Sequence, residues 1–184
     1  FENRLAGWVG KTCNFLMTNS LTIATVERQN FFGGLATPIH FFDQTLGNNF
    51  KPTVAENSYV FSGCTIQFAK AAAAKSGVKL IGIRVRRLAG VLIQGNTFIN
   101  EGGPPATKAD TAIFLDPAFV NGGPAQDCLI TQNNFKGWVK NQGAADVEIS
   151  VGCTGNYIDC LNSTDLVRNL GDATNTVSGG TLIP

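Results

Sequence analysis

Acidic residues stand at both ends of the two longest irregular segments of the sequence. These segments, residues 101–110 and 116–127, are rich in Gly and Pro and are bounded by Glu101, Asp110, Asp116 and Asp127. Two carboxyl groups about 5 to 9.5 Å apart can cleave a glycosidic bond, one as the acid and the other as the nucleophile or base. Carboxylates beside Gly and Pro also cap turns, so a purely structural role stays open.

Further candidates for the same site follow from a sequence repeat. The repeat places Lys136 and Asp159 at equivalent positions, and Trp138 and Glu101 two positions further along. A neutral polar strip that contains one Trp fits a polysaccharide, although a Trp can equally pack beneath a loop. We therefore predict Trp138 and Lys136 as substrate-binding residues. The predicted catalytic carboxylates are Glu101, Asp110, Asp116 and Asp159.

The repeat also predicts the elements that carry these residues. It consists of an apolar residue, an anchor three positions later that is mostly Asn, and a second apolar residue two positions after the anchor. The clearest copies are Ile93/Asn96/Phe98 and Ile130/Asn133/Phe135. The anchors fall at positions 29, 64, 96, 133, 156 and 180. The two shortest steps, 23 and 24 residues, suit one turn of a solenoid made of three short strands, with loops inserted in the longer turns.

Alternation within each copy supports strands rather than helices. Apolar residues three and five positions before the anchor are expected to face inward, and the polar residues between strand and anchor to face outward. The residue directly before the anchor is mostly Gly, which tolerates the left-handed backbone of a sharp corner. We expect Asn side chains to stack at this corner and to bond to backbone groups. A sandwich would instead show strands at 8 to 12 residue spacing.

Composition excludes several classes of protein. Charged residues make up 15% of the chain and the formal net charge is +1, so no strong field attracts nucleic acid or an anionic membrane. Apolar stretches are interrupted well before the roughly 18 residues that cross a bilayer. The normal share of apolar residues excludes disorder. We predict neither a nucleic-acid partner nor membrane insertion.

The copies resemble the right-handed parallel β-helix, the pectate-lyase-like superfamily, whose coils often carry an I-x-x-N-x-F corner. The resemblance covers residues 21–184 and implies an all-β fold in a single domain over residues 1–184, with residues 1–20 unassigned. Because the sequence starts with Phe1 and neither end looks like a polar cap, we expect a piece of a longer chain. The superfamily includes lyases, hydrolases, epimerases, adhesins and phage tailspikes, so the corner motif does not select an activity.

The cysteines and glycine pairs predict no cofactor and no metal. The five cysteines include no C-x-x-C pair, which favours buried free thiols over a zinc site or a disulfide framework. The glycine pairs at 33–34 and 122–123 do not match a nucleotide-binding loop.

A row of outward positions predicts the oligomeric state. The residues four positions before the anchors form a row whose first members are apolar, although solvent would favour polar side chains there. The row comprises Val60, Leu92, Leu129, Gly152 and Thr176. Such a row suggests burial against another subunit. In this respect the chain resembles trimeric phage tailspikes, whose β-helices pack side by side. The resemblance implies a homotrimer.

The leading hypothesis is a phage tailspike or capsule depolymerase fragment that binds, and if enzymatic cleaves, a bacterial surface polysaccharide. The resemblance implies an extracellular location on the phage tail, and either glycoside hydrolase or polysaccharide lyase activity. One alternative is a non-catalytic structural or adhesive β-helix of a fibre or baseplate. Another is a secreted polysaccharide lyase, from which the chain departs because it lacks an Asp cluster for calcium with a nearby Arg-x-Pro.

Overall fold

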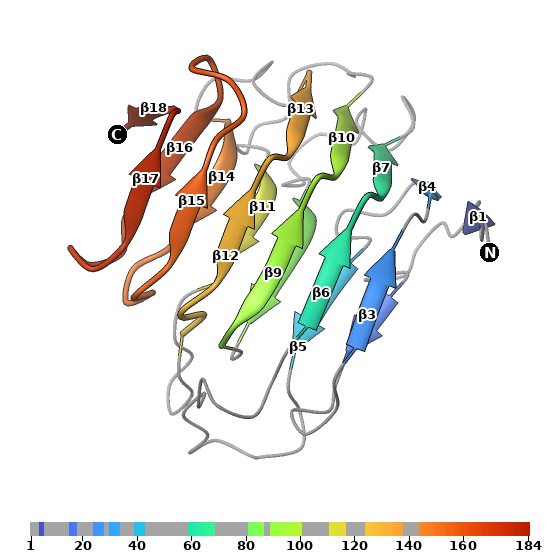
Figure 1. Ribbon diagram of the computed structural model, residues 1–184, viewed down its shortest axis with the longest axis horizontal. Coiled ribbons are helices and arrows are strands. Elements are labelled where there is room, and N and C mark those ends of the chain that lie inside the picture. The colour runs from blue at the N-terminus through green and yellow to red at the C-terminus, as the bar shows by residue number, and fades with distance from the viewer. Residues whose placement is uncertain are drawn as a thin grey trace.

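Three parallel β-sheets, stacked coil upon coil, make up the described part of the molecule (Figure 1). The computed structural model describes residues 4–5, 15–17, 24–27, 30–33, 39–42, 59–68, 81–86, 89–100, 111–116, 124–137 and 144–184. These residues form strands and turns, and none of their segments is a helix that could span a membrane. The all-β, parallel solenoid predicted from the repeat is therefore confirmed at this level.

Each sheet collects one strand from successive coils. Sheet A contains β1 (Arg4–Leu5), β4 (Asn30–Gly33), β7 (Thr65–Phe68), β10 (Thr97–Asn100) and β13 (Asn134–Lys136). Sheet B contains β2 (Phe15–Met17), β5 (Ile39–Phe42), β8 (Ile81–Arg86), β11 (Thr111–Leu115), β14 (Ala145–Ile149), β16 (Leu166–Asn169) and β18 (Thr181–Ile183). Sheet C contains β3 (Ala24–Glu27), β6 (Tyr59–Ser62), β9 (Val91–Gln94), β12 (Leu129–Thr131), β15 (Tyr157–Asp159) and β17 (Thr176–Ser178).

The chain visits the sheets in the order A, B, C from β1 to β15, and then omits sheet A. It passes from β15 directly to β16, and from β17 directly to β18. Sheet C faces the viewer in Figure 1, with sheet B behind it and sheet A along the upper edge. The coils therefore narrow from three strands to two toward residue 184, and β13 is the last strand of sheet A among the described residues.

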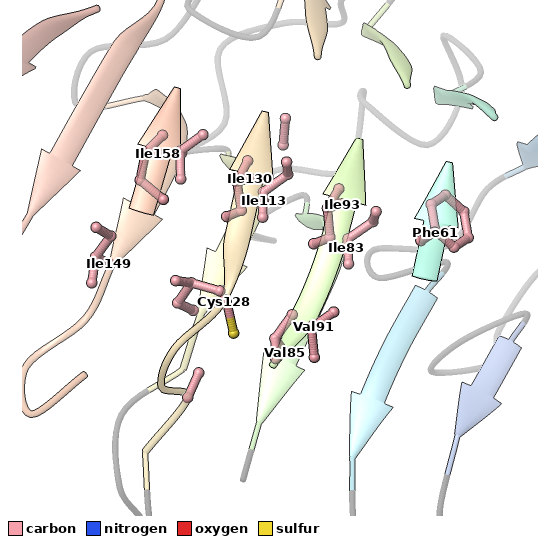
Figure 2. Packing of buried hydrophobic residues seen from close by; sticks show 14 of the residues in the cluster. Phe61, Ile83, Val85, Val91, Ile93, Ile113, Cys128, Ile130, Ile149 and Ile158 are labelled. Atoms are coloured by element: carbon pink, nitrogen blue, oxygen red, sulfur yellow. The ribbon is translucent and has the colours of Figure 1, made fainter. Parts of the chain in front are cut away.

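Inward side chains of all three sheets form one apolar core. Figure 2 labels members of this core from sheets B and C. On sheet C the buried residues are aligned one above the next, because the strands are parallel and in register. The aligned set is Phe61, Ile93, Ile130 and Ile158. On sheet B the aligned set is Ile83, Ile113, Val147 and Val167. Burying each such side chain contributes about 1.5 to 3 kcal/mol.

Phe98 and Phe135 stack inside sheet A, as the repeat predicted. Their ring centroids are 5.3 Å apart. Phe98 is fully buried, whereas Phe135 on the last strand of the sheet is half-buried. The difference follows from the narrowing of the coils, since no described strand of sheet A follows β13.

A ladder of asparagines closes the two-residue corner between sheets C and A. The Asn96 side-chain Oδ1 accepts the backbone N–H of Cys64 at 2.9 Å, and its Nδ2 donates to the carbonyl of Phe61 at 3.0 Å. One coil later, Asn133 Oδ1 accepts the backbone N–H and the Nδ2 of Asn96, and Asn133 Nδ2 donates to Ile93. The side chains thus pair backbone groups that the corner would otherwise leave buried without partners.

A second, separate ladder closes the corner between sheets B and C. Asn156 Oδ1 accepts the backbone N–H of Cys128 at 3.0 Å, and Asn175 Oδ1 accepts the backbone N–H of Asn156 at 3.0 Å. Asn175 Nδ2 donates to the carbonyl of Cys153 at 2.7 Å. A residue with positive φ precedes each of these corners, Asp127 before Cys128 and Gly155 before Asn156.

The expected register of one repeat copy is wrong. The sequence repeat aligned Asn156 with Asn133, but Asn156 belongs to the other corner and Ile158 lies on sheet C beside Ile130. Val151, expected inside, is exposed. Both corners use a left-handed residue followed by Asn, so the same local pattern marks two places on the coil. Residues joined by a ladder hydrogen bond are 32 and 37 positions apart at the corner between sheets C and A. They are 28 and 19 positions apart at the corner between sheets B and C.

Replacing a ladder side chain is expected to lower the free energy of unfolding more than replacing a neighbouring outward side chain. In Asn96→Leu, the buried N–H of Cys64 and carbonyl of Phe61 lose their partners, at about 1 to 3 kcal/mol each. We therefore expect urea denaturation to show a loss of about 3 to 5 kcal/mol. Asn134→Thr is the matched control, because Thr97 and Thr65 occupy this register position in the two preceding strands. Equal losses in the two variants would contradict the ladder.

The corner backbone gives a second prediction. Gly63, Gly95 and Gln132 occupy the same corner position with φ of 62°, 64° and 55°. A left-handed backbone costs a non-glycine residue about 1 to 2 kcal/mol. Gln132→Gly should therefore raise the free energy of unfolding by up to about 1 kcal/mol, after the entropy cost of glycine.

Gly95→Ala is the reciprocal variant. A Cβ at this position would meet no atom within 4 Å, so only the backbone conformation opposes it. We expect a loss of about 1 kcal/mol, measured by the same denaturation. If both substitutions left stability unchanged, the corner would not have the left-handed backbone described above.

Candidate functional site

Three of the predicted catalytic carboxylates border an irregular segment, and of these Asp116 alone lies among the described residues. It follows β11, is 2% exposed, and its Oδ2 lies 2.8 Å from Nε of Arg84. The predicted residues Glu101, Asp110 and Trp138 lie outside the described residues, as does Cys13. Asp116 is thus held inside the molecule by an ion pair, and its buried charge is balanced by a guanidinium.

Asp159 lies on a different sheet from the other described candidates. It ends β15 on sheet C, where it is aligned with Thr131 and accepts that hydroxyl at 3.0 Å. Lys136 lies on sheet A, aligned with Ile99. The expectation that Asp159 shares a row with Lys136 is therefore wrong, because it rested on the shifted register of Asn156.

The outer face of sheet B carries a row of charged and aromatic side chains that we call the sheet-B strip. Its aligned members are Arg84, Phe114, Glu148 and Arg168. The Arg84 guanidinium carbon lies 5.5 Å from the centroid of the Phe114 ring, within the range of a cation–π contact. Arg168 Nη1 lies 3.2 Å from Glu148 Oε2. Asp116 belongs to the strip through its ion pair with Arg84.

Sequence reasoning missed Glu148, although a signal for it exists. Residues 145–149 read Ala-Asp-Val-Glu-Ile, and Ala145, Val147 and Ile149 are all fully buried. This alternation of apolar and acidic residues is typical of a strand with one face in the core. It would have placed Glu148 on the opposite face, where Thr111 also donates a hydrogen bond to its Oε2 at 3.3 Å.

Asp116 and Glu148 are two carboxylates on the outer face of sheet B, where Asp146 also lies two residues before Glu148 on β14. Glu148 is aligned with Phe114, so Asp116 lies two positions further along the neighbouring strand. Their carboxyl groups turn apart, because Asp116 bonds to Arg84 on β8 and Glu148 bonds to Arg168 on β16, on the opposite side of the β11–β14 pair. Both side chains are buried, and each is paired with an arginine. The strip is therefore a charge-balanced structural network.

The outer face of sheet A is the polar surface next to the first asparagine ladder. One row consists of Thr65, Thr97 and Asn134, all half-buried and in register. The second row places Lys136 beside Ile99, and Lys136 is exposed. This face therefore offers hydroxyl and amide groups at the regular spacing of strands, with one accessible cation at its end.

The described cysteines are free thiols, as predicted. Cys64, Cys128 and Cys153 are buried and Cys160 is half-buried. Burial raises the pKa of the Cys128 and Cys153 thiols to about 12 and that of Cys160 to about 11. These three sulfur atoms are therefore protonated at neutral pH and are poor nucleophiles.

Neither a metal-binding cluster among the described residues nor a known relative adds to this description of the site. Within the described ranges, no three or more His, Cys, Asp and Glu side chains gather in a group that could hold a metal ion. Comparison with known protein families, with characterised proteins and with solved structures finds no match to this chain.

Proposed function

We propose that the chain is a segment of a phage tailspike-like protein that binds a bacterial surface polysaccharide outside the cell. The stacked parallel coils support this proposal at the level of architecture. We also propose that the coil is right-handed and that the chain is a member of the pectate-lyase-like superfamily. The strong preference of parallel strand connections for the right hand favours the right-handed coil. The low share of charged residues, 15%, also suits a neutral polymer partner.

The outer face of sheet A is the observation that carries the binding part of the proposal. Its rows of Thr, Asn and Lys side chains repeat from strand to strand, as hydroxyl groups repeat along a polysaccharide. Lys136 is exposed at the end of the face, where it can donate hydrogen bonds to sugar hydroxyls or pair with an acidic sugar. Recognition of an extended chain by this face needs no cofactor.

Cleavage would need a carboxylate pair in addition to the binding face. Asp116 and Glu148 lie on neighbouring strands of one face, and Glu101, Asp110 and Asp159 remain candidates from the sequence. In a hydrolase, one member would protonate the leaving oxygen and the other would activate water or attack the sugar. A lyase would instead remove a proton next to an acidic sugar's carboxyl group.

The burial of Asp116 and Glu148 favours a second candidate function, a structural or adhesive β-solenoid without catalysis. Each carboxylate already has an arginine partner, and breaking such a buried pair is costly. An adhesive solenoid would use the same sheet-A face and would leave the polysaccharide intact. The two candidates therefore differ in product formation and agree in binding.

Binding and cleavage can be separated in one set of measurements. Purified capsule and lipopolysaccharide O-antigen are titrated with the protein, and chain length is followed by size-exclusion chromatography. We expect binding that Lys136→Gln weakens about tenfold, because a charge-assisted hydrogen bond contributes roughly 1.5 to 3 kcal/mol. Thr176→Ala, at an exposed position on sheet C, is the control and should bind as the parent does.

The carboxylates are tested by the variants Glu101→Gln, Asp110→Asn, Asp116→Asn, Glu148→Gln and Asp159→Asn. If the protein shortens the polysaccharide, at least one of these should lower turnover by orders of magnitude while Lys136-dependent binding persists. Binding without shortening supports the adhesive candidate. Absence of binding to every bacterial surface polysaccharide tested would contradict the proposal.

A homotrimer is the second part of the proposal, and an apolar row on sheet C supports it. Val60, Leu92 and Leu129 are aligned in register on the outer side of β6, β9 and β12. Tyr157 continues the row in place of the expected Gly152. Leu129 is 40% and Tyr157 43% exposed in the single chain. An aligned apolar row on an outer face suits contact with a second copy.

Sedimentation velocity tests the oligomer. The parent protein should sediment as a trimer, and Leu92→Asp combined with Leu129→Asp should sediment as a folded monomer, because the two carboxylates would be buried without partners in the interface. Gln94→Glu, on the adjacent outward row of the same sheet, is a comparison for surface charge. A monomeric parent, or a double variant that remains trimeric, would contradict this part of the proposal.

A further inference from the structure

A buried aspartate joins the last coils to the body of the solenoid. Asp146 lies in β14, is 3% exposed, and its Oδ2 accepts the backbone N–H of Leu166 at 2.8 Å. Leu166 is the first residue of β16, the strand with which the two-stranded coils begin. The Asp146 carboxyl group therefore bonds to the point at which the chain, after omitting sheet A, returns to sheet B.

Among the described residues, the ionisable groups close to Asp146 are mainly acidic, and Glu148 stands two positions further along the same strand. Asp165, which precedes Leu166, is 4% exposed, and its carboxylate accepts hydrogen bonds from the backbone N and the Nδ2 of Asn162. Cys160 lies in the same corner and interacts with Asp146, Asp159 and Asp165. The strand on the other side of β14 is β11, and the described acidic residue that adjoins this strand, Asp116, is paired with Arg84.

The nearest basic group in the neighbouring strand is already engaged with another carboxylate. Arg168 of β16 bonds to Glu148 and to the carbonyl of Pro184. An ionised Asp146 thus faces the Asp165 carboxylate in a buried corner. Burial is the main cause that raises the pKa of Asp146 from 3.8 to about 6. The hydrogen bond from the Leu166 N–H opposes this rise, and the Asp165 charge adds a smaller contribution to it.

We propose that Asp146 is a proton-operated latch that holds strands β16 to β18 on the solenoid when it is neutral and loosens them when it ionises. In the neutral state, the carbonyl oxygen of the carboxyl group accepts the Leu166 N–H without placing a second negative charge beside Asp165. When the proton leaves to solvent, the two carboxylates repel each other in a corner that water hardly reaches. Local opening of the two-stranded coils is the response to this repulsion that costs the least free energy, because these coils have the smallest core.

The direction of the pH dependence follows from the raised pKa. The folded protein binds the proton more tightly than the unfolded chain does, so the stabilisation is complete below the ordinary pKa of 3.8. It is lost as the pH rises toward about 6, and it stays lost above that value. This is the opposite of the behaviour of a salt-bridged aspartate.

Hydrogen exchange of the intact protein at several pH values tests the latch. After correction for intrinsic exchange rates, protection of the amides in β16 and β18 should fall roughly 30-fold between about pH 4.5 and about pH 7.5. Protection in β9 and β12, in the middle of sheet C, should change much less. Unchanged protection in β16 and β18 over this pH range would overturn the proposal.

Variants assign the effect to Asp146. Asp146→Asn keeps an oxygen acceptor for the Leu166 N–H and cannot ionise, so protection should be high and independent of pH. Asp165→Asn removes the repelling charge and should move the midpoint to lower pH. Asp127→Asn, at an exposed position outside this corner, is the matched control and should retain the parent's pH profile. An Asp146→Asn profile equal to the parent's would overturn the proposal.

A direct titration keeps the test decisive if a variant does not fold. The side-chain carboxyl carbon of Asp146 in the parent protein, followed by NMR, should titrate with a midpoint near 6. The amide signals of β16 should shift with the same midpoint. A midpoint near the ordinary aspartate value would overturn the proposal.

Discussion

The fold depends on pairing the backbone groups at its corners. A strand in a parallel sheet pairs its N–H and C=O groups with its neighbours, but backbone groups at a corner lie outside the strands and need other partners. Asn96 and Asn133 supply the missing partners between sheets C and A, and Asn156 and Asn175 do so between sheets B and C. With the corners fixed in register, each inward side chain lies above its counterpart, and the core of stacked Ile, Val and Phe residues follows.

The sequence predicted the coil and most of its core because the signals are local. The spacing of Ile93, Asn96 and Phe98 determines one strand, one corner and the start of the next strand. It misplaced Asn156 because two corners of the same coil have the same chemistry, and only strand pairing tells them apart. The ion pairs could not be predicted, since Arg84 and Asp116, or Glu148 and Arg168, meet only after the coils stack.

Charge in this molecule is sparse and is confined to particular places. The sheet-B strip balances each buried carboxylate with an arginine, whereas the corner around Asp146 and Asp165 gathers acids beside one another. Among the described side chains, the outer faces of sheets A and C carry few charges, with Lys136 on sheet A and Asp159 on sheet C. The apolar row on sheet C suits contact between like surfaces, and the hydroxyl and amide rows on sheet A suit a neutral polymer. The solenoid therefore separates structural charge from the surfaces proposed for recognition.

The account rests most heavily on there being two distinct asparagine ladders, and scalar couplings across hydrogen bonds test this directly by NMR. We expect the backbone nitrogen of Cys64 to couple to the side-chain carbonyl carbon of Asn96, and that of Cys128 to couple to the side-chain carbonyl carbon of Asn156. A coupling between the backbone nitrogen of Asn133 and the side chain of Asn156 would place both residues in one ladder and would contradict the register on which the fold and both candidate surfaces depend.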